Sequence, residues 1–154
     1  MKSIIMQKTK NTYINKNRFV IFCNELFTIK TSFSSEEVYR ILSKNGVVKE
    51  LINGYEDLHG MSTSFLNQYI SGLSGIKESY SNKQDHSLAK FLIFTDVVEM
   101  ISREYRVSLD EARERFYASE VIKFFSDDEL GLYGDSPNYI FSLYKKEQIR
   151  KEHN

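Results

Sequence analysis

The sequence has few of the residues that interrupt or cross-link a chain. Its 154 residues include one proline, seven glycines, one cysteine and no tryptophan. Such low proline and glycine content disfavours a turn-rich all-β fold and favours long helices. The single cysteine, Cys23, excludes an internal disulfide and any site built on a Cys-x-x-Cys pair. Cys23 stands in an apolar run with no nearby base, so we expect a buried, unreactive thiol.

Long apolar runs are also missing. The longest uninterrupted one covers residues 19–23, whereas a bilayer span needs about 20 residues. Near the N-terminus only Ile4, Ile5 and Met6 are consecutive apolar residues, too few for the core of a signal peptide. We therefore expect a cytoplasmic protein.

Net charge is absent as well, because 21 basic and 21 acidic residues cancel. This balance argues against a polyanion-binding surface over the whole chain but not against a local patch. No acid precedes Glu25, while five cations do: Lys2, Lys8, Lys10, Lys16 and Arg18. Residues 108–135 are instead rich in acids: Asp110, Glu111, Glu114, Glu120, Asp127, Asp128, Glu129 and Asp135. Solvated helix faces explain this pattern, and a steering surface for a charged partner is the functional alternative.

What the sequence does contain is a set of helix signals. Ser34 with Glu37, and Ser108 with Glu111, read as capping boxes, and Ser136 before Pro137 is a third helix start. The segment 88–105 places apolar residues on one helical face. The run 19–23 could form a strand, but its extension through residue 27 favours a helix. We predict an all-α protein.

The two halves of the chain resemble each other on either side of a polar, serine-rich linker at residues 74–87. Residues 19–22 match residues 91–94 at an offset of 72, and the later features match at an offset of 74: the capping boxes, 47–49 with 121–123, and 58–62 with 132–136. The change of offset implies a two-residue insertion in the first interhelical turn of the second half. We predict two tandem helical modules at 18–73 and 88–150, after a basic segment at 1–17. They would pack as a pseudo-twofold pair, or each would pair with a module of a second chain in a homodimer.

Local motifs for catalysis or metal binding are not found. His59, His86 and His153 are far apart and match no zinc spacing. Asp127, Asp128 and Glu129 lack the positions of a calcium loop and read as a helix or turn cap. Phosphate-cradling glycine motifs and the nucleophile elbow are absent. We expect no cofactor, no metal and no enzymatic activity, although a site assembled from distant residues would leave no local motif.

Aromatic residues are frequent, at 14% of the chain. Most belong in a core, and those left exposed would be rigid anchors for a protein partner. For a partner-binding surface we select Tyr133, Asp135 and Tyr139 as anchors, with Asp127, Asp128 and Glu129 as steering charge, together with His59. Nucleic-acid binding would instead use Lys8, Lys10, Lys16 and Arg18. Acids in the capped helices after Ser34 and Ser108 oppose a helix-turn-helix interpretation.

Both halves resemble a bacterial family of short helical proteins. The first half carries the resemblance in Phe19-Val20-Ile21-Phe22-Cys23, Glu37-Val38-Tyr39, Gly46-Val47 and Gly54-Tyr55-Glu56-Asp57-Leu58-His59. The second half carries it in Phe116-Tyr117-Ala118-Ser119, Gly131-Leu132-Tyr133-Gly134 and Ser136-Pro137-Asn138-Tyr139-Ile140. Together these segments span 19–147. Members of that family are often encoded beside small proteins resembling ADP-ribosyltransferase toxins, which implies an accessory, immunity or antitoxin role and supplies no catalytic residues.

We therefore predict a non-enzymatic protein that neutralises or regulates a partner protein by covering a basic functional surface. The partner class implied by the resemblance is an ADP-ribosyltransferase-like toxin. Alternatives are a phage or mobile-element inhibitor of a nucleic-acid enzyme, a DNA-binding regulator using the basic N-terminus, and an enzyme with a dispersed site.

Overall fold

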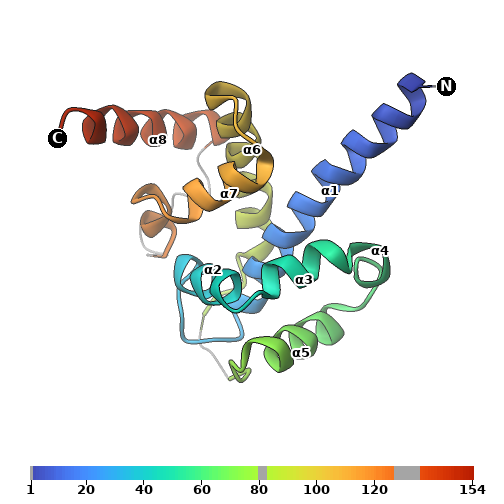
Figure 1. Cartoon of the computed structure of the whole chain (residues 1–154). Helices are drawn as coiled ribbons and strands as arrows, with labels where there is room; N and C mark the ends of the chain where they lie inside the picture. The colour runs from blue at the N-terminus through green and yellow to red at the C-terminus, as the bar shows by residue number, and fades with distance from the viewer. Residues whose placement is uncertain (1, 80–82, 127–135) are drawn as a thin grey trace.

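Among the residues that the structure describes, the regular elements are all helices (Figure 1). The computed structural model describes residues 2–79, 83–126 and 136–154. Its elements are α1 (Lys2–Thr28), α2 (Ser35–Lys44), α3 (Val47–Asn53), α4 (Tyr55–Leu58), α5 (Thr63–Ser74), α6 (Ser87–Tyr105), α7 (Leu109–Tyr117), the 3-10 helix η1 (Val121–Ser126) and α8 (Pro137–Glu152). The all-α prediction is confirmed. Within the described part of the chain, no helix has the length and apolarity that a bilayer crossing demands.

Serine side chains cap the helices where the sequence predicts them. The Oγ atoms of Ser34, Ser108 and Ser136 each accept the backbone N–H of the residue three positions later, at 3.4, 3.0 and 3.2 Å respectively. Ser62 caps α5 in the same way at 3.1 Å, at a helix start that was not predicted. These bonds satisfy N–H groups that a helix start otherwise leaves unpaired.

The core is organised around α1 and α6, which pack along each other. α2, α3 and α5 pack against α1, while α7 and α8 pack against α6. Cys23 lies in this core, free and fully buried, and burial raises the pKa of its thiol far above the ordinary value. The predicted inert thiol is consistent with this environment, because only the thiolate is reactive.

Three helices of the first half begin 74 residues before a helix of the second half. α2 and α7 begin at 35 and 109, α3 and η1 at 47 and 121, and α5 and α8 at 63 and 137. The difference is 74 each time, and we call it the repeat offset. Burial follows it too, because every buried residue of α6 lies at this offset from a buried residue of α1. The pairs are Phe19/Ile93, Val20/Phe94, Ile21/Thr95, Cys23/Val97, Asn24/Val98 and Phe27/Ile101, and the series continues with Val47/Val121, Val48/Ile122 and Leu51/Phe125.

The predicted two-residue insertion is wrong. The turn between α6 and α7 covers only residues 106–108, whereas the turn between α1 and α2 covers 29–34. The offset of 72 would pair Val20, which is 1% exposed, with Leu92, which is 55% exposed. Each residue advances a helix by about 100°. A similar run of apolar residues therefore does not determine which face of the helix turns inward. The buried positions of α1 and α6 correspond at an offset of 74.

The first predicted boundary and the predicted linker can both be located in the fold. α1 runs without a break across the boundary expected at residues 17 and 18. The linker predicted at 74–87 lies between α5 and α6 and is tied to the end of α1. The Ser79 N–H donates to the Lys30 carbonyl oxygen at 2.8 Å, and the Lys83 ammonium donates to the carbonyl oxygens of Thr28 and Phe33.

Candidate functional site

The predicted partner-binding residues are only partly described. Asp127, Asp128, Glu129, Tyr133 and Asp135 lie outside the described residues. Of that set, Tyr139 and His59 are placed by the structure, on α8 and at the end of α4. These helices lie on different sides of the molecule (Figure 1), so the two residues do not form one site.

Tyr139 stands in the first turn of α8, with its side chain 49% exposed. Its backbone N–H donates to Ser136 Oγ. Phe65 occupies the same place in α5, after the Ser62 cap, and is 42% exposed. The two rings are thus separated by the repeat offset and similarly presented. In the sequence, Phe65-Leu66 and Tyr139-Ile140 are both aromatic-aliphatic pairs 74 residues apart, which is the signal that could have identified Phe65.

His59 is held by its own helix. Its ring stacks on Tyr55 with 4.5 Å between centroids, and Nδ1 lies 2.7 Å from the Tyr55 carbonyl oxygen. The residue is exposed. These contacts with Tyr55 fit a structural role for His59 as a turn residue, which is the alternative to a role in partner binding.

The predicted basic residues all lie on α1. Lys8 and Lys10 are exposed, and Lys16 is half-buried. Arg18 differs from them because its Nε donates to Glu99 Oε1 on α6 at 2.9 Å. That contact raises the pKa of the guanidinium. Arg18 therefore helps to join α1 to α6, and the three lysines remain as the basic set.

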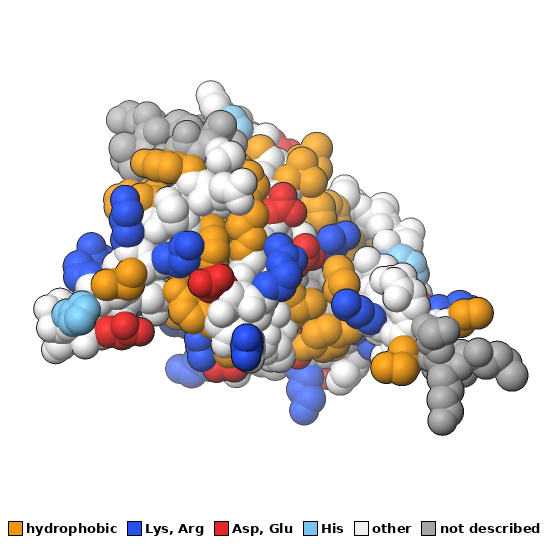
Figure 2. Space-filling view, turned by 90° about the horizontal axis from the view of Figure 1, so that it is seen from above, with side chains coloured by type: hydrophobic (Ala, Val, Ile, Leu, Met, Phe, Trp, Pro, Cys, Tyr) orange, Lys and Arg blue, Asp and Glu red, His pale blue; other side chains and the backbone are white. Residues whose placement is uncertain are grey.

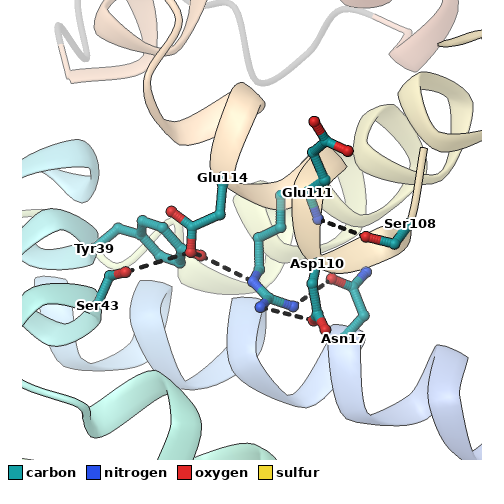
Figure 3. Close-up of polar contacts among 8 residues, drawn as sticks. Asn17, Tyr39, Ser43, Ser108, Asp110, Glu111 and Glu114 are labelled. Atoms are coloured by element: carbon teal, nitrogen blue, oxygen red, sulfur yellow. Dashed lines mark hydrogen bonds and ion pairs between the residues drawn. The ribbon is translucent and has the colours of Figure 1, made fainter.

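A buried arginine organises the contact between α1, α2 and α7 (Figure 3). Arg113, 2% exposed, donates from Nε to Tyr39 Oη at 3.0 Å, from Nη1 to Asn17 Oδ1 at 2.9 Å and from Nη2 to Asp110 Oδ1 at 2.9 Å. Tyr39 in turn donates to Glu114 Oε1 at 2.6 Å. We call these five residues the Arg113 network.

A buried carboxylate forms a second cluster beside it. Glu25 accepts Ser35 Oγ at 2.6 Å on Oε1, and accepts Asn24 Nδ2 at 3.0 Å and Tyr117 Oη at 2.8 Å on Oε2. Burial raises the pKa of Glu25, and the three hydrogen bonds oppose that shift only in part. The rings of Tyr39 and Tyr117 stack at 4.2 Å between centroids, so the Glu25 cluster and the Arg113 network are continuous.

These groups were not selected from the sequence, although a signal was present. Glu25 interrupts the apolar stripe of residues 19–29, and Arg113 lies between Ala112 and Phe116 on the buried face of α7. Charged residues in register with an apolar face are buried only when paired. The register therefore marked both as members of polar contacts, but the distant partners could not be read from spacing.

Two cavities adjoin this region. One of about 230 Å³ lies at the α1–α2 turn and is lined by Glu25, Ser35, Lys83, His86 and Lys90, among others. Another of about 360 Å³ lies between α2 and α7, with Arg40, Glu114 and Lys123 in its wall. Among the described residues, no group of three His, Cys, Asp or Glu side chains is placed to hold a metal ion.

Comparison of the chain with family models, with curated proteins and with solved structures finds no match.

Proposed function

We propose that this chain is a non-enzymatic binding protein that neutralises or regulates a partner protein. The observation that carries the proposal is the pair of exposed rings, Phe65 and Tyr139. Each stands in the first turn of a capped helix, and the two occupy equivalent positions of the repeat. Leaving an aromatic ring in water forgoes the stabilisation of burial, and exposed aromatic residues are typical anchors of protein interfaces.

We also propose that the chain consists of two tandem modules packed as a pseudo-twofold pair. Helix starts and buried positions that recur at the repeat offset support the duplication. The pairing is supported by contacts between equivalent elements, α1 with α6 and α2 with α7. Tyr39 and Arg113, which are themselves equivalent positions, are hydrogen-bonded. Residues near a twofold axis contact their own equivalents in this way.

The use made of the buried ionisable groups favours a binder over an enzyme. Glu25 accepts three hydrogen bonds, and Arg113 donates to three different residues. Both groups thereby join helices of the core. A catalytic acid or base would have to reach a substrate proton, whereas these atoms already serve the fold.

The partner class comes from the resemblance, which implies an ADP-ribosyltransferase-like toxin. In the proposed mechanism Tyr139, with Tyr133 and Asp135, anchors the partner, while the acids at 127–129 steer its basic surface toward this side. The steering role is based on the charges of the sequence alone, since residues 127–135 are not described. His59 is not part of this surface.

The proposal is tested by affinity capture with the tagged full-length chain, with and without nuclease treatment. We expect one stoichiometric protein partner, insensitive to nuclease, and at least tenfold weaker capture by the double variant Phe65→Ala/Tyr139→Ala. The matched control is Leu88→Ala/Leu92→Ala, which truncates two exposed apolar side chains of α6 and should retain the partner.

Loss of the partner in the control, with retention in the Phe65/Tyr139 variant, would overturn the proposed anchor role of these two rings. Recovery of proteins only through nucleic acid would overturn the protein-binding role. Charge reversal at residues 127–129 separately tests steering: association should slow while dissociation changes little, and an unchanged association rate would remove that part.

A further inference from the structure

The N-terminal half of α1 projects from the body of the molecule (Figure 1). α1 contains 27 residues, a length of about 40 Å, and only its C-terminal half lies in the core. The described side chains from Met6 to Asn11 are all exposed, and the first fully buried position is Asn17. We call residues 2–16 the basic arm.

Positive charge on the arm is not balanced locally. The first acid of the chain is Glu25, which is buried in the core. Some exposed cations elsewhere on the described surface pair with carboxylates, as Arg115 does with Glu111 and Arg150 with Glu120. Lys8, Lys10 and Lys16 have no such ion pair within the described residues. The arm is thus a local cationic patch on a chain of zero net charge.

Polar side chains accompany the lysines, and one of them, Thr12, donates from Oγ1 to the Lys8 carbonyl oxygen at 2.9 Å. Lys8, Thr9, Thr12, Tyr13 and Lys16 surround a shallow hollow on one face of the arm. Lys8 and Lys16 stand about 12 Å apart along the helix axis. Lysine, threonine and tyrosine side chains are groups that proteins use to contact phosphate oxygens.

A second hollow lies on the side of the arm that faces the body. It has a volume of about 400 Å³, and its walls include Lys10 and Tyr13 from the arm and Arg103 and Ser108 from the α6–α7 corner. From above, Lys and Arg side chains are spread across the adjoining face of the molecule, between apolar and acidic ones (Figure 2). Arg103 therefore adds a cation beside the arm, in a hollow that Glu99, the partner of Arg18, also lines.

We propose that the basic arm binds the phosphate backbone of duplex nucleic acid through Lys8, Lys10 and Lys16. This activity is separate from the proposed partner anchors, Phe65 on α5 and Tyr139 on α8, two helices on different sides of the molecule (Figure 1). A single projecting helix fits the major groove of B-form DNA, which is about 12 Å wide. Three exposed or half-exposed lysines would neutralise phosphates and release their counterions.

The composition of the arm favours nucleic acid over a lipid surface or a second copy of the chain. Gln7, Asn11 and Asn15 alternate with the lysines and threonines around the helix. A helix lying on a membrane needs a continuous apolar face, whereas the exposed apolar residues Ile4 and Met6 are confined to the tip. Packing of two arms against each other would bring like charges together.

The test is a fluorescence-anisotropy titration of the full-length chain against a mixed-sequence DNA duplex at several KCl concentrations. We expect binding at low salt. For three phosphate contacts, the logarithm of the binding constant should fall with the logarithm of the KCl concentration with a slope of about −2.7. The variant Lys8→Glu/Lys10→Glu/Lys16→Glu should bind at least about tenfold more weakly with a flattened slope. The matched control, Lys44→Glu/Lys49→Glu/Lys77→Glu, makes the same change of charge at lysines outside the arm and should bind within about threefold of wild type.

Parallel titrations use single-stranded DNA, polyglutamate and vesicles containing anionic lipid. No binding of duplex at low salt, equal loss in the arm variant and the control, or stronger arm-dependent binding to polyglutamate or vesicles would each overturn the proposal. Circular dichroism checks that the arm variant remains folded. The Phe65→Ala/Tyr139→Ala variant should bind DNA like wild type, so failure of one proposal is distinguishable from failure of the other.

Discussion

Positions separated by the repeat offset can be compared directly, since both members of a pair lie in equivalent helices. Val38 and Leu42 of α2 correspond to Ala112 and Phe116 of α7, and all four are buried and apolar. Tyr39, between them, corresponds to Arg113, and these two residues are hydrogen-bonded to each other. In the apolar pairs both side chains are apolar and differ only in size. In the polar pair a neutral tyrosine corresponds to a charged arginine.

The same contrast holds at the carboxylates. Glu25 and Glu99 are equivalent positions, yet Glu25 is buried among three hydrogen-bond donors, while Glu99 pairs with exposed Arg18. At these positions the two halves differ in the polar contacts that they make. Tyr39 fits against Arg113, and pairing two copies of the first half would place Tyr39 against Tyr39. The polar positions therefore favour pairing within one chain.

The strongest way to break this pairing is to remove Arg113. We expect Arg113→Ala to lower the free energy of unfolding by about 4 kcal/mol, because it leaves Tyr39, Asn17 and Asp110 without their buried donor. Urea denaturation followed by circular dichroism measures the change. The control Arg103→Ala, at an exposed position of α6, should cost less than about 0.5 kcal/mol. A loss below about 1 kcal/mol in Arg113→Ala would show that the network does not hold the halves together.

The pH dependence of stability distinguishes Glu25 from Glu99, its half-buried counterpart at the repeat offset. Burial raises the pKa of Glu25 above its usual 4.5, so the folded state binds this proton more tightly than the unfolded state does. The contribution of Glu25 is then most favourable below pH 4.5 and is lost as the pH rises through the folded-state pKa. Relative to Glu25→Gln, the wild type should lose about 1.4 kcal/mol for each unit that separates the two pKa values.

Denaturation of both proteins between about pH 4 and about pH 8 measures this difference. Glu99→Gln is the control and should track the wild type closely, because its carboxylate pairs with an exposed arginine. A wild type that gains stability over Glu25→Gln as the pH rises would show that the hydrogen bonds dominate over burial.

The helix caps should instead behave alike in the two halves. Ser34→Ala and Ser108→Ala each remove one side-chain acceptor at a helix start, at a cost of about 1 kcal/mol. Thermal denaturation of both single variants and of the double variant checks the size and the additivity. Costs differing by more than about 1 kcal/mol would show that the equivalence of the two caps is only formal.

The smallest effect is expected at the exposed ion pair of α7. Arg115 donates to Glu111 at 2.9 Å, and both side chains are well exposed, so water and salt screen the pair. Arg115→Ala should change the free energy of unfolding by less than about 0.5 kcal/mol in the same urea denaturation. A large loss of unfolding free energy in Arg115→Ala would contradict the expectation that the exposed Arg115 stabilises the fold much less than the buried Arg113.

Much of the fold was predictable from local signals. Ser34, Ser108 and Ser136 mark helix starts because capping depends on neighbouring residues, and the apolar face of 88–105 follows from helical periodicity. The offset of the repeat was not predictable in full, since the run at 19–22 resembles 91–94, which is shifted from its structural equivalent. Only burial distinguishes the two alignments.

The candidate site was less predictable. Lys8, Lys10 and Lys16 stood out by composition, but nothing in the sequence indicated that they project from the body. Arg113 and Tyr39 are far apart in the sequence, and their contact is created by tertiary packing alone. Phe65 was visible only as a match to Tyr139, and its exposure follows from the face that α5 turns to α1.

The solitary thiol of Cys23 makes this core observable in the unmodified protein. A reagent in solution cannot reach it until α1 separates from its neighbours, and no other thiol competes for the label. The rate of modification therefore reports how often the native molecule opens. Labelling of Cys23 thus measures the opening of the core without any introduced probe.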